Sequence, residues 1–273
     1  MGGWRQGMKI TDLKKGYQVS GHFLPVLKGL NLETEDHGIT VVLGRSGCGK
    51  TTLLRLVAGL EKADGGSIRW GDCENHDSDC QNSHKIGVIF QEPRLMPWLT
   101  VEKNILFGVQ KKGRDGTEEE RLKQLLTLTG LTGFEKARPS QLSGGMRQRV
   151  ALARALAYEP GYLLMDEPFA ALDYFTRAQM QQELLNIYRI QKKGILFVTH
   201  SIEEALTIGT HIVVLEDGIC GREYHLETLA FPRDLLSGEM IGLKRELEET
   251  INEKKNTCTD TYTGIGSGIP GRM

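Results

Sequence analysis

Short apolar runs, each bounded by glycine, proline or polar residues, recur along the chain. Such runs are typical of strands that are buried on both faces of a largely parallel sheet. They fall at residues 39–43, 86–90, 162–165, 195–198 and 211–215. Apolar and polar positions instead alternate over residues 26–34, and this pattern predicts a half-buried strand.

Helical spacing of apolar residues follows several of these runs, at residues 51–58, 148–157, 174–191 and 202–206. The alternation of strands and helices predicts an α/β fold with a central sheet. Between residues 100 and 140 the pattern changes, because two helical stretches, 101–107 and 118–128, occur with no clear strand between them. We interpret this region as a helical subdomain inserted into the α/β core.

Three further segments carry their own patterns. Residues 69–85 are polar and without periodicity, which predicts a loop or a hairpin tip. Met240, Leu243, Leu247 and Ile251 form an apolar stripe at helical spacing, which predicts an amphipathic helix. Residues 256–273 are rich in Thr and Gly, and we expect this tail to be disordered.

Composition narrows the class of protein. The chain of 273 residues is 39% hydrophobic and 25% charged, which is ordinary for a soluble protein. Its 34 Lys and Arg residues and 35 Asp and Glu residues give a net charge of −1. The chain therefore lacks the net positive charge that is typical of nucleic-acid-binding proteins. No apolar run approaches the roughly 18 residues of a membrane helix, so we expect no span. The 5 scattered cysteines are typical of reduced thiols rather than of a disulfide framework.

The clearest motif is Gly44-Arg45-Ser46-Gly47-Cys48-Gly49-Lys50-Thr51. It matches the phosphate loop G-x-x-x-x-G-K-[ST], and it follows a predicted strand and opens a predicted helix, which is the context that such a loop requires. Glycines allow backbone N–H groups to point at phosphate oxygens, and the helix N-terminus adds partial positive charge. Lys50 would reach the β- and γ-phosphates, and the Thr51 hydroxyl would ligate Mg²⁺.

Two adjacent acids end the strand predicted at residues 162–165. Asp166 suits the Mg²⁺ shell, and Glu167 suits a general base that polarises the attacking water. Successive strand side chains face opposite ways, so the two acids need not have the same task. A strand that ends in Asp-Glu is a weak signal alone, and the phosphate loop strengthens it.

A third motif, Leu142-Ser143-Gly144-Gly145-Met146, precedes a basic, alanine-rich helix predicted over residues 147–157. Taken alone, it is typical of an N-cap serine followed by glycines that begin a helix. Together with the other two motifs, the sequence closely resembles the ATP-binding-cassette (ABC) ATPases, whose signature lies between the phosphate loop and the acidic strand. The family's usual fifth signature residue is Gln where this chain has Met146, whereas Ser143 and Gly145 are intact.

The resemblance covers residues 8–230 and implies an α/β P-loop NTPase fold of the ABC ATPase type. It places an inserted helical subdomain at about residues 92–158 and an antiparallel β-subdomain at the N-terminus. Residues 231–255 would form a C-terminal amphipathic helical extension.

The resemblance also implies a set of site residues, with ATP and Mg²⁺ as cofactors. Gln91 occupies the Q-loop position, Ala170-Ala171-Leu172-Asp173 resembles the D-loop, and His200 matches the switch histidine. Catalysis is assigned to Lys50, Gln91, Glu167 and His200, and Mg²⁺ to Thr51, Gln91 and Asp166. ATP would contact Tyr17, Gly44, Arg45, Ser46, Gly47, Cys48, Gly49, Lys50, Thr51, Thr52, Ser143, Gly144, Gly145 and Asp173. Phe23 competes with Tyr17 as the aromatic that stacks on adenine.

Residues 90–101, Phe-Gln-Glu-Pro-Arg-Leu-Met-Pro-Trp-Leu-Thr-Val, resemble the ATPase subunits of nitrate, sulfonate and taurine importers. This implies a peripheral subunit on the cytoplasmic face of the cell membrane that energises solute import. Its partners would be a second nucleotide-binding subunit, expected to be a second copy, and membrane permease subunits, with a solute-binding protein acting indirectly. The alternatives are a soluble ABC ATPase without transport, such as the iron–sulfur assembly type, which residues 93–101 disfavour, and a P-loop kinase, which residues 142–146 disfavour.

Three smaller features lead to expectations of their own. Cys48 lies beside Lys50 at a helix N-terminus, and both would lower the pKa of its thiol. Trp98 is either an exposed contact for the membrane subunit or a core residue of the helical subdomain. Four metal-capable residues occur close together, but their spacing fits no standard zinc pattern, so we expect a solvated loop. They are Cys73, His76, Cys80 and His84.

Overall fold

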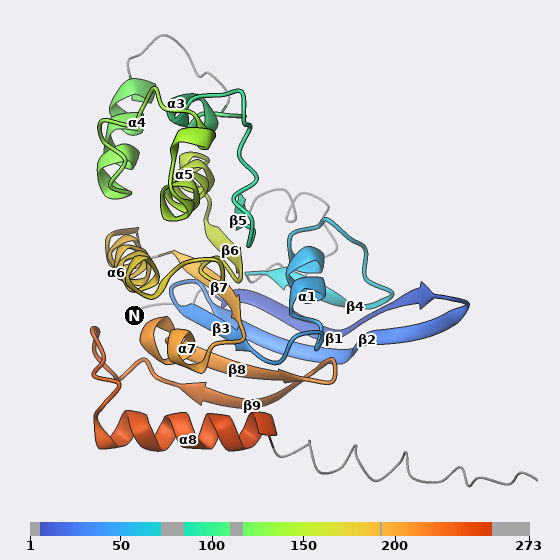
Figure 1. The fold of residues 1–273 in the computed structure, drawn as a ribbon. Coiled ribbons are helices and arrows are strands. Elements are labelled where there is room, and N and C mark those ends of the chain that lie inside the picture. Colours follow the sequence, from blue (N-terminus) through green and yellow to red (C-terminus); the bar gives the residue numbers. More distant parts are fainter. Residues whose placement is uncertain (1–5, 72–84, 110–116, 192, 253–273) are drawn as a thin grey trace, which may run out of the picture.

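The computed structural model describes residues 6–71, 85–109, 117–191 and 193–252. Its centre is a six-stranded sheet in the order β5-β6-β7-β3-β8-β9 (Figure 1). Neighbouring strands from β5 to β8 run parallel, and β9 pairs antiparallel with β8 at the edge. The strands are β3 (Ile39–Leu43), β5 (Ile86–Ile89), β6 (Tyr162–Asp166), β7 (Gly194–Thr199), β8 (His211–Glu216) and β9 (Ile219–His225).

The central sheet is buried on both faces, as the apolar runs predict. Side chains of β3 alternate between two hydrophobic clusters, with Ile39, Val41 and Leu43 in one and Val42 in the other. All five residues of β3 and all five of β6 are buried. The prediction of a buried, largely parallel sheet is therefore confirmed.

An antiparallel sheet in the order β2-β1-β4 lies beside the core. β1 (Gln6–Val19) and β2 (His22–Glu35) form a long hairpin, and β4 (Gly65–Trp70) pairs with β1. The strand predicted at residues 26–34 is confirmed as part of β2. The prediction of a loop beginning at residue 69 is wrong for Arg69 and Trp70, which pair with Lys9 and Met8.

The segment between β5 and β6 is helical, as expected. It contains α3 (Val101–Ile105), α4 (Thr117–Leu128), the 3₁₀ turn η1 (Pro139–Gln141) and α5 (Gly144–Ala157), which gather at the top of Figure 1. Helix α5 begins four residues before the helix predicted from residue 148. Its apolar side chains, such as Val150 and Leu152, join the same hydrophobic cluster as β3 and β6, so the helical segment packs on the core.

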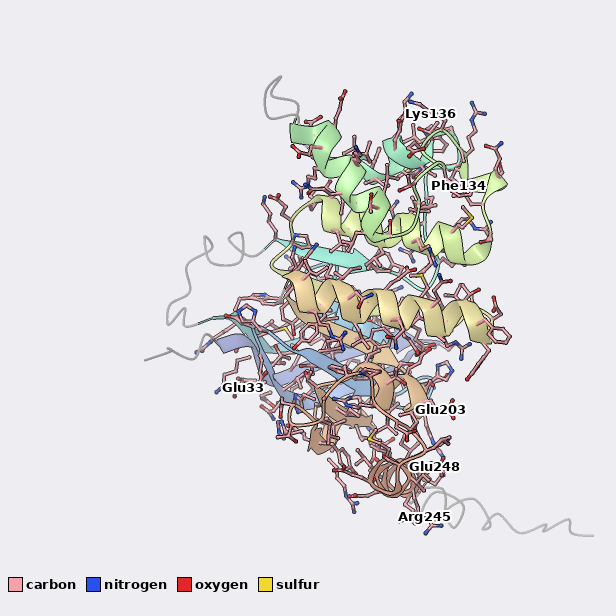
Figure 2. All side chains as sticks on the ribbon, turned by 90° about the vertical axis from the view of Figure 1, so that its left-hand side faces the viewer. Glu33, Phe134, Lys136, Glu203, Arg245 and Glu248 are labelled. Carbon is pink, nitrogen blue, oxygen red and sulfur yellow. The ribbon has the colours of Figure 1, made fainter. Side chains whose placement is uncertain are left out.

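The other helices in the described part of the chain are α1 (Lys50–Val57), α6 (Tyr174–Gln191), α7 (Ile202–Ile208) and α8 (Gly238–Asn252). The stripe predicted on α8 is confirmed, because Met240 and Leu247 are buried in the core and Leu243 and Ile251 pack against it. Figure 2 shows Arg245 and Glu248 projecting from α8 at one end of the molecule, opposite Phe134 and Lys136 of the helical segment.

The predicted metal-capable residues and the C-terminal tail fall outside the part of the chain that the structure describes. They are Cys73, His76, Cys80 and His84, and residues 256–273. Within the described residues, no helix combines the length and the apolar character that a membrane span requires.

Candidate functional site

The loop between β3 and α1 has a backbone that only glycine adopts without strain at two positions. Gly47 has φ 83° and Gly49, the N-cap of α1, has φ 108°. A Cβ at Gly44 would lie 2.5 Å from the carbonyl oxygen of Leu215. Arg45, Ser46 and Gly47 are exposed at the end of the loop. This shape and exposure fit a loop that presents backbone N–H groups to an anion.

Lys50 turns back over the loop from the first turn of α1. Its Nζ donates to the carbonyl oxygens of Gly44 and Arg45, each at 2.8 Å, and lies 3.6 Å from Oε1 of Glu167. The side chain is only 5% exposed. The ammonium group is therefore held between the phosphate loop and the acidic end of β6.

Thr51 and Asp166 form a pair of oxygen ligands beside this ammonium group. The Thr51 hydroxyl donates to Oδ1 of Asp166 at 3.2 Å. Burial raises the pKa of the Asp166 carboxyl, and the Thr51 hydrogen bond lowers it in part. A carboxylate and a hydroxyl are the oxygen donors that Mg²⁺ prefers, and a cation here would offset the cost of burying the charge. The residues present therefore fit Mg²⁺.

Glu167 and His200 meet at the carboxyl ends of the neighbouring strands β6 and β7. The backbone of Glu167 has φ 44°, and its N–H donates to the carbonyl oxygen of Val198. Its Oε2 lies 2.9 Å from Nδ1 of His200. The Glu167 side chain is 18% exposed and that of His200 is 53% exposed, so the carboxylate faces solvent only partly. A carboxylate in this position can accept a proton from a water molecule near the loop.

Gln91 lies just beyond β5, at the same carboxyl edge of the sheet, and its side chain is exposed. Helix α5 holds the backbone around it. Nε2 of Gln148 donates to the carbonyl oxygen of Phe90, and the Arg154 guanidinium donates to those of Pro93 and Arg94. The predicted Q-loop is thus connected directly to the helix that follows the signature motif.

Tyr17 and Phe23 differ in how they are held. The Tyr17 hydroxyl donates to Oε2 of Glu61, and burial and this contact raise its pKa. Its phenol also lies close to the Thr52 side chain of α1. Phe23 is 60% exposed and lies over Gly16. Between the two, the structure places Tyr17 nearer to the phosphate-loop helix.

The signature motif forms the N-terminal end of α5. Oγ of Ser143 caps the helix by accepting from the Met146 N–H at 3.2 Å, and both Ser143 and Gly144 are exposed. Gly145 is packed against α6, since a Cβ there would lie 2.4 Å from Cγ2 of Thr176. Thr176 in turn donates to Asp173 through its backbone N–H and its hydroxyl, and these bonds lower the pKa of Asp173.

Two groups of predicted residues therefore occur in one chain. Lys50, Thr51, Asp166, Glu167 and His200 contact one another around the phosphate loop, whereas Ser143, Gly144, Gly145 and Asp173 lie together at the ends of α5 and α6. Across the described residues, no hydrogen bond or ion pair joins the second group to the phosphate loop.

The expectation for Cys48 is wrong. Burial raises the pKa of its thiol, although Lys50 lowers it in part. The reason is that the side chain turns inward, with Sγ 2.8 Å from where a Cβ of Gly44 would lie, rather than toward the exposed end of the loop. A position beside a helix N-terminus does not reveal this direction.

Two contacts near the site are absent from the sequence-based predictions. Glu204 is buried behind His200, where it accepts from the Thr199 hydroxyl and lies 3.7 Å from Arg177, and burial raises its pKa. Arg45 donates from Nη2 to Oδ1 of Asn252, the last described residue of α8, at 3.0 Å. No local motif signals the second contact, because 207 residues separate its partners.

A groove of about 350 Å³ opens beside the Q-loop segment. Arg94, Met96, Phe107, Arg154 and Tyr158 contribute to its wall. Trp98 follows Met96 and is 69% exposed, so the alternative that it is a core residue is wrong.

Comparison with known proteins agrees with this geometry. The ABC transporter family model matches residues 27–170. An aliphatic sulfonates import ATP-binding protein of Bacillus thuringiensis is 42% identical over 76% of this chain and 80% of its own length. A taurine import ATP-binding protein of Pseudomonas savastanoi is 42% identical over 94% of this chain and 97% of its own. A dimeric ATP-binding cassette in a post-hydrolysis state, bound to ADP and Pi, superposes with a TM-score of 0.69 at 32% identity, covering 80% of this chain and 98% of that one.

Proposed function

This chain belongs to the ABC transporter family and is an ABC ATPase, and from that premise we propose that it energises the import of a small anionic solute of the sulfonate or taurine class. The observation that carries the hydrolytic part is the contact of Lys50, Glu167 and His200 at the phosphate loop. The names of the relatives support import over the soluble, non-transport alternative.

Hydrolysis needs a base for water and compensation for negative charge on the phosphates. Glu167 supplies the base, and His200 orients its carboxylate through the 2.9 Å contact. Lys50 and the N–H groups of the glycine-rich loop stabilise the phosphate oxygens, and Tyr17 stacks on adenine. Mg²⁺, when bound by Thr51, Asp166 and Gln91, neutralises charge between the phosphates.

A second copy of the chain would complete each site. Ser143 and Gly144 are exposed at a helix N-terminus, where backbone N–H groups and partial positive charge suit a phosphate. In a head-to-tail dimer, the signature of one copy contacts the nucleotide held by the phosphate loop of the other. The dimeric cassette among the similar structures supports this arrangement.

The membrane permease would dock at the groove beside the Q-loop segment. The groove combines apolar walls with two arginines, and exposed Trp98 lies next to it in sequence. Because Gln148 and Arg154 connect this segment to α5, a shift at the groove moves the signature end as well. In this proposal the subunit lies on the cytoplasmic face of the cell membrane, with a solute-binding protein as an indirect partner.

The test is to reconstitute the chain with the permease and the solute-binding protein encoded beside its gene, and to measure uptake by proteoliposomes. Taurine, an alkanesulfonate and nitrate are offered separately, with ATP inside or outside. We expect ATP-dependent uptake of one of these anions and none with Glu167→Gln. ATPase activity without uptake of any of the three would contradict the solute class, and ATPase activity that no permease stimulates would contradict the transport function.

A further inference from the structure

A cluster of titratable side chains lies on the β8–β9 hairpin, away from the phosphate loop. His211 begins β8 and pairs with Thr40 of β3, whereas the phosphate loop follows the other end of β3. His225 ends β9 and is the direct cross-strand partner of His211. Glu223 precedes His225 by two residues, so both side chains project from the same face of β9.

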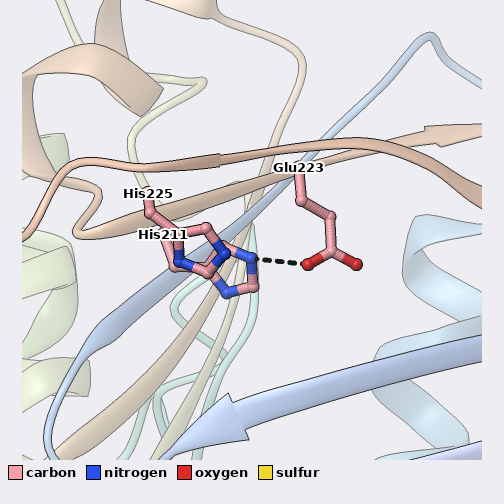
Figure 3. A group of neighbouring side chains, drawn as sticks. All are labelled: His211, Glu223 and His225. Carbon is pink, nitrogen blue, oxygen red and sulfur yellow. Dashed lines mark hydrogen bonds and ion pairs between the residues drawn. The ribbon is translucent and has the colours of Figure 1, made fainter.

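The three side chains are close enough to share one ligand. The imidazoles of His211 and His225 are stacked, with centroids 4.4 Å apart and planes 5° from parallel. Nε2 of His211 lies 3.1 Å from Oε2 of Glu223 (Figure 3). One nitrogen of each ring and one oxygen of Glu223 all lie within 4.8 Å of one another.

A neighbouring carboxylate orients the second ring of the cluster. Nδ1 of His225 lies 3.2 Å from Oε1 of Glu227. If it donates there, the Nε2 lone pair is free for a metal, and the carboxylate holds the ring from behind.

We propose that His211, Glu223 and His225 form a binding site for a divalent transition metal, with Zn²⁺ as its representative. Two imidazoles and one carboxylate are a ligand set of zinc sites, whereas Mg²⁺ and Ca²⁺ prefer oxygen ligands alone. Ligands at about 2.0–2.1 Å from a tetrahedral ion lie about 3.3 Å apart, close to the observed separation of His211 and Glu223. The His225 side chain is 62% exposed, so an ion from solvent can reach it.

Such an ion would connect β8 with the end of β9. The chain then runs through Arg233, whose guanidinium donates to the carbonyl oxygens of Leu206, Gly209 and Leu226, to α8. A metal that binds only the folded hairpin raises the melting temperature increasingly as its concentration exceeds its Kd. The site would thus stabilise the C-terminal part of the chain without touching the nucleotide.

The experiment is a Zn²⁺ titration of the full chain without nucleotide, followed by calorimetry and by melting temperature, with Co²⁺ absorption reporting the ligands. The variant is His225→Ala, and Glu223→Gln is the second variant. His22→Ala, which removes an exposed histidine from the β1–β2 hairpin, is the matched control. All proteins carry Cys73→Ser, His76→Ala, Cys80→Ser and His84→Ala, which remove the other close set of potential ligands.

We expect one equivalent of Zn²⁺ that raises the melting temperature, and about 10–100-fold weaker binding in both His225→Ala and Glu223→Gln. His22→Ala should bind as the parent does, and the variants should melt as the parent does without metal. Unchanged affinity in His225→Ala, or an equal loss in His22→Ala, would overturn the proposal.

Discussion

Around the phosphate loop, the functional side chains already contact one another within a single chain. Lys50 is 5% exposed and Asp166 is 8% exposed, and each has polar partners there. At the N-terminal end of α5, by contrast, Ser143 and Gly144 face solvent, and the Ser143 side chain bonds only its own helix among the described residues. In the proposed function, the first region supplies the groups for chemistry, whereas the second would be a binding surface for a second copy of the chain.

If the proposed function holds, this difference would explain how the subunit binds nucleotide alone and yet depends on a second copy for hydrolysis. Preorganised buried groups cost no rearrangement when the reaction occurs. An exposed helix N-terminus attracts a phosphate only weakly until water is displaced from between them, because water screens the interaction. Dimerisation would supply that displacement, so we expect binding and hydrolysis to respond differently to changes in the two regions.

The largest effect should come from Glu167→Gln. The amide keeps the size of the side chain but cannot accept the proton from water, so turnover should fall about 10²–10⁴-fold. ATP should still bind and should hold the protein as a dimer. Steady-state hydrolysis, nucleotide binding and sedimentation are measured on the same sample. The control is Glu203→Gln, an exposed acid of α7, which should hydrolyse ATP normally. Wild-type turnover in Glu167→Gln would refute its role as base.

The second prediction uses one variant in each region to test whether the two regions act in different chains. Lys50→Ala removes the buried ammonium group of one region, and Gly144→Glu places a carboxylate on the exposed surface of the other. The acid is compatible with the first turn of α5 and repels a phosphate across the interface. Each variant alone should be nearly inactive, and Gly144→Glu should melt normally because the nearest atom to a Cβ at Gly144 is Nη2 of Arg147, at 4.0 Å.

Mixing these two variants should restore activity. A mixed head-to-tail dimer contains one site with an intact phosphate loop and an intact signature, so equal mixing should recover up to about a quarter of the wild-type sites. The control is a mixture of Lys50→Ala with Glu167→Gln, which both alter the same region and should not recover. No recovery in the mixture of Lys50→Ala with Gly144→Glu would contradict a site shared between two chains and would indicate that each site lies within one chain.

The contrast between the regions also marks what could be predicted from the sequence. The strand–loop–helix order around residues 39–58 and the two acids at the end of β6 were predictable because each depends on neighbours in sequence. Strands β1, β4 and β9 escaped individual prediction because they are long, polar or at a sheet edge. Only some residues of β1 and β4 are buried, and those of β9 are exposed or half-buried. Their pairing depends on distant segments rather than on a local apolar run.

The same reason limits prediction of the site. The chain's own pattern indicated the two acids at residues 166 and 167, whereas Gln91 and His200 were implied only by the resemblance to ABC ATPases, and both follow the carboxyl ends of their strands. The sequence could not indicate that Cys48 turns inward, that Asn252 reaches Arg45, or that His211 and His225 stack. Each of these depends on the direction of a side chain or on the packing of a late element against an early one.

An effect of intermediate size concerns Trp98 beside the groove. If the permease covers this side chain, Trp98→Ala should weaken docking by about 2 kcal/mol, or about thirtyfold. Basal ATPase and melting temperature should not change, because Trp98 is exposed and lies apart from the phosphate contacts. The matched control is Phe134→Ala, another exposed aromatic of the helical segment that does not line the groove. If Trp98→Ala supports solute uptake and permease-stimulated ATPase activity as the wild type does, the docking surface lies elsewhere.

A smaller effect concerns the reactivity of Cys48. Because burial raises the pKa of its thiol, maleimide should label it several-fold more slowly than an unfolded cysteine at pH 7.5, on the order of tenfold. Cys220 is the internal comparison, since burial raises its pKa to about 12 and it should label more slowly still. Peptide mapping after timed labelling measures both. Rapid labelling of Cys48 would mean that the loop opens readily and is less preorganised than its contacts indicate.

The smallest effect concerns the contact between Arg45 and Asn252, which tests whether the phosphate-loop region is independent of the C-terminal helix. The hydrogen bond is exposed, so Asn252→Ala should change the free energy of unfolding by no more than about 0.5 kcal/mol. The truncation frees the Arg45 guanidinium to approach phosphate oxygens, and ATP affinity should rise by about twofold at most. Asn252→Asp is the matched variant, because a carboxylate holds Arg45 more firmly and should lower ATP affinity by a similar factor. Titration with a fluorescent ATP analogue at two salt concentrations measures both, and the effect of the carboxylate should shrink as salt screens it. A tenfold change in either variant would show that the end of α8 belongs to the nucleotide site rather than lying beside it.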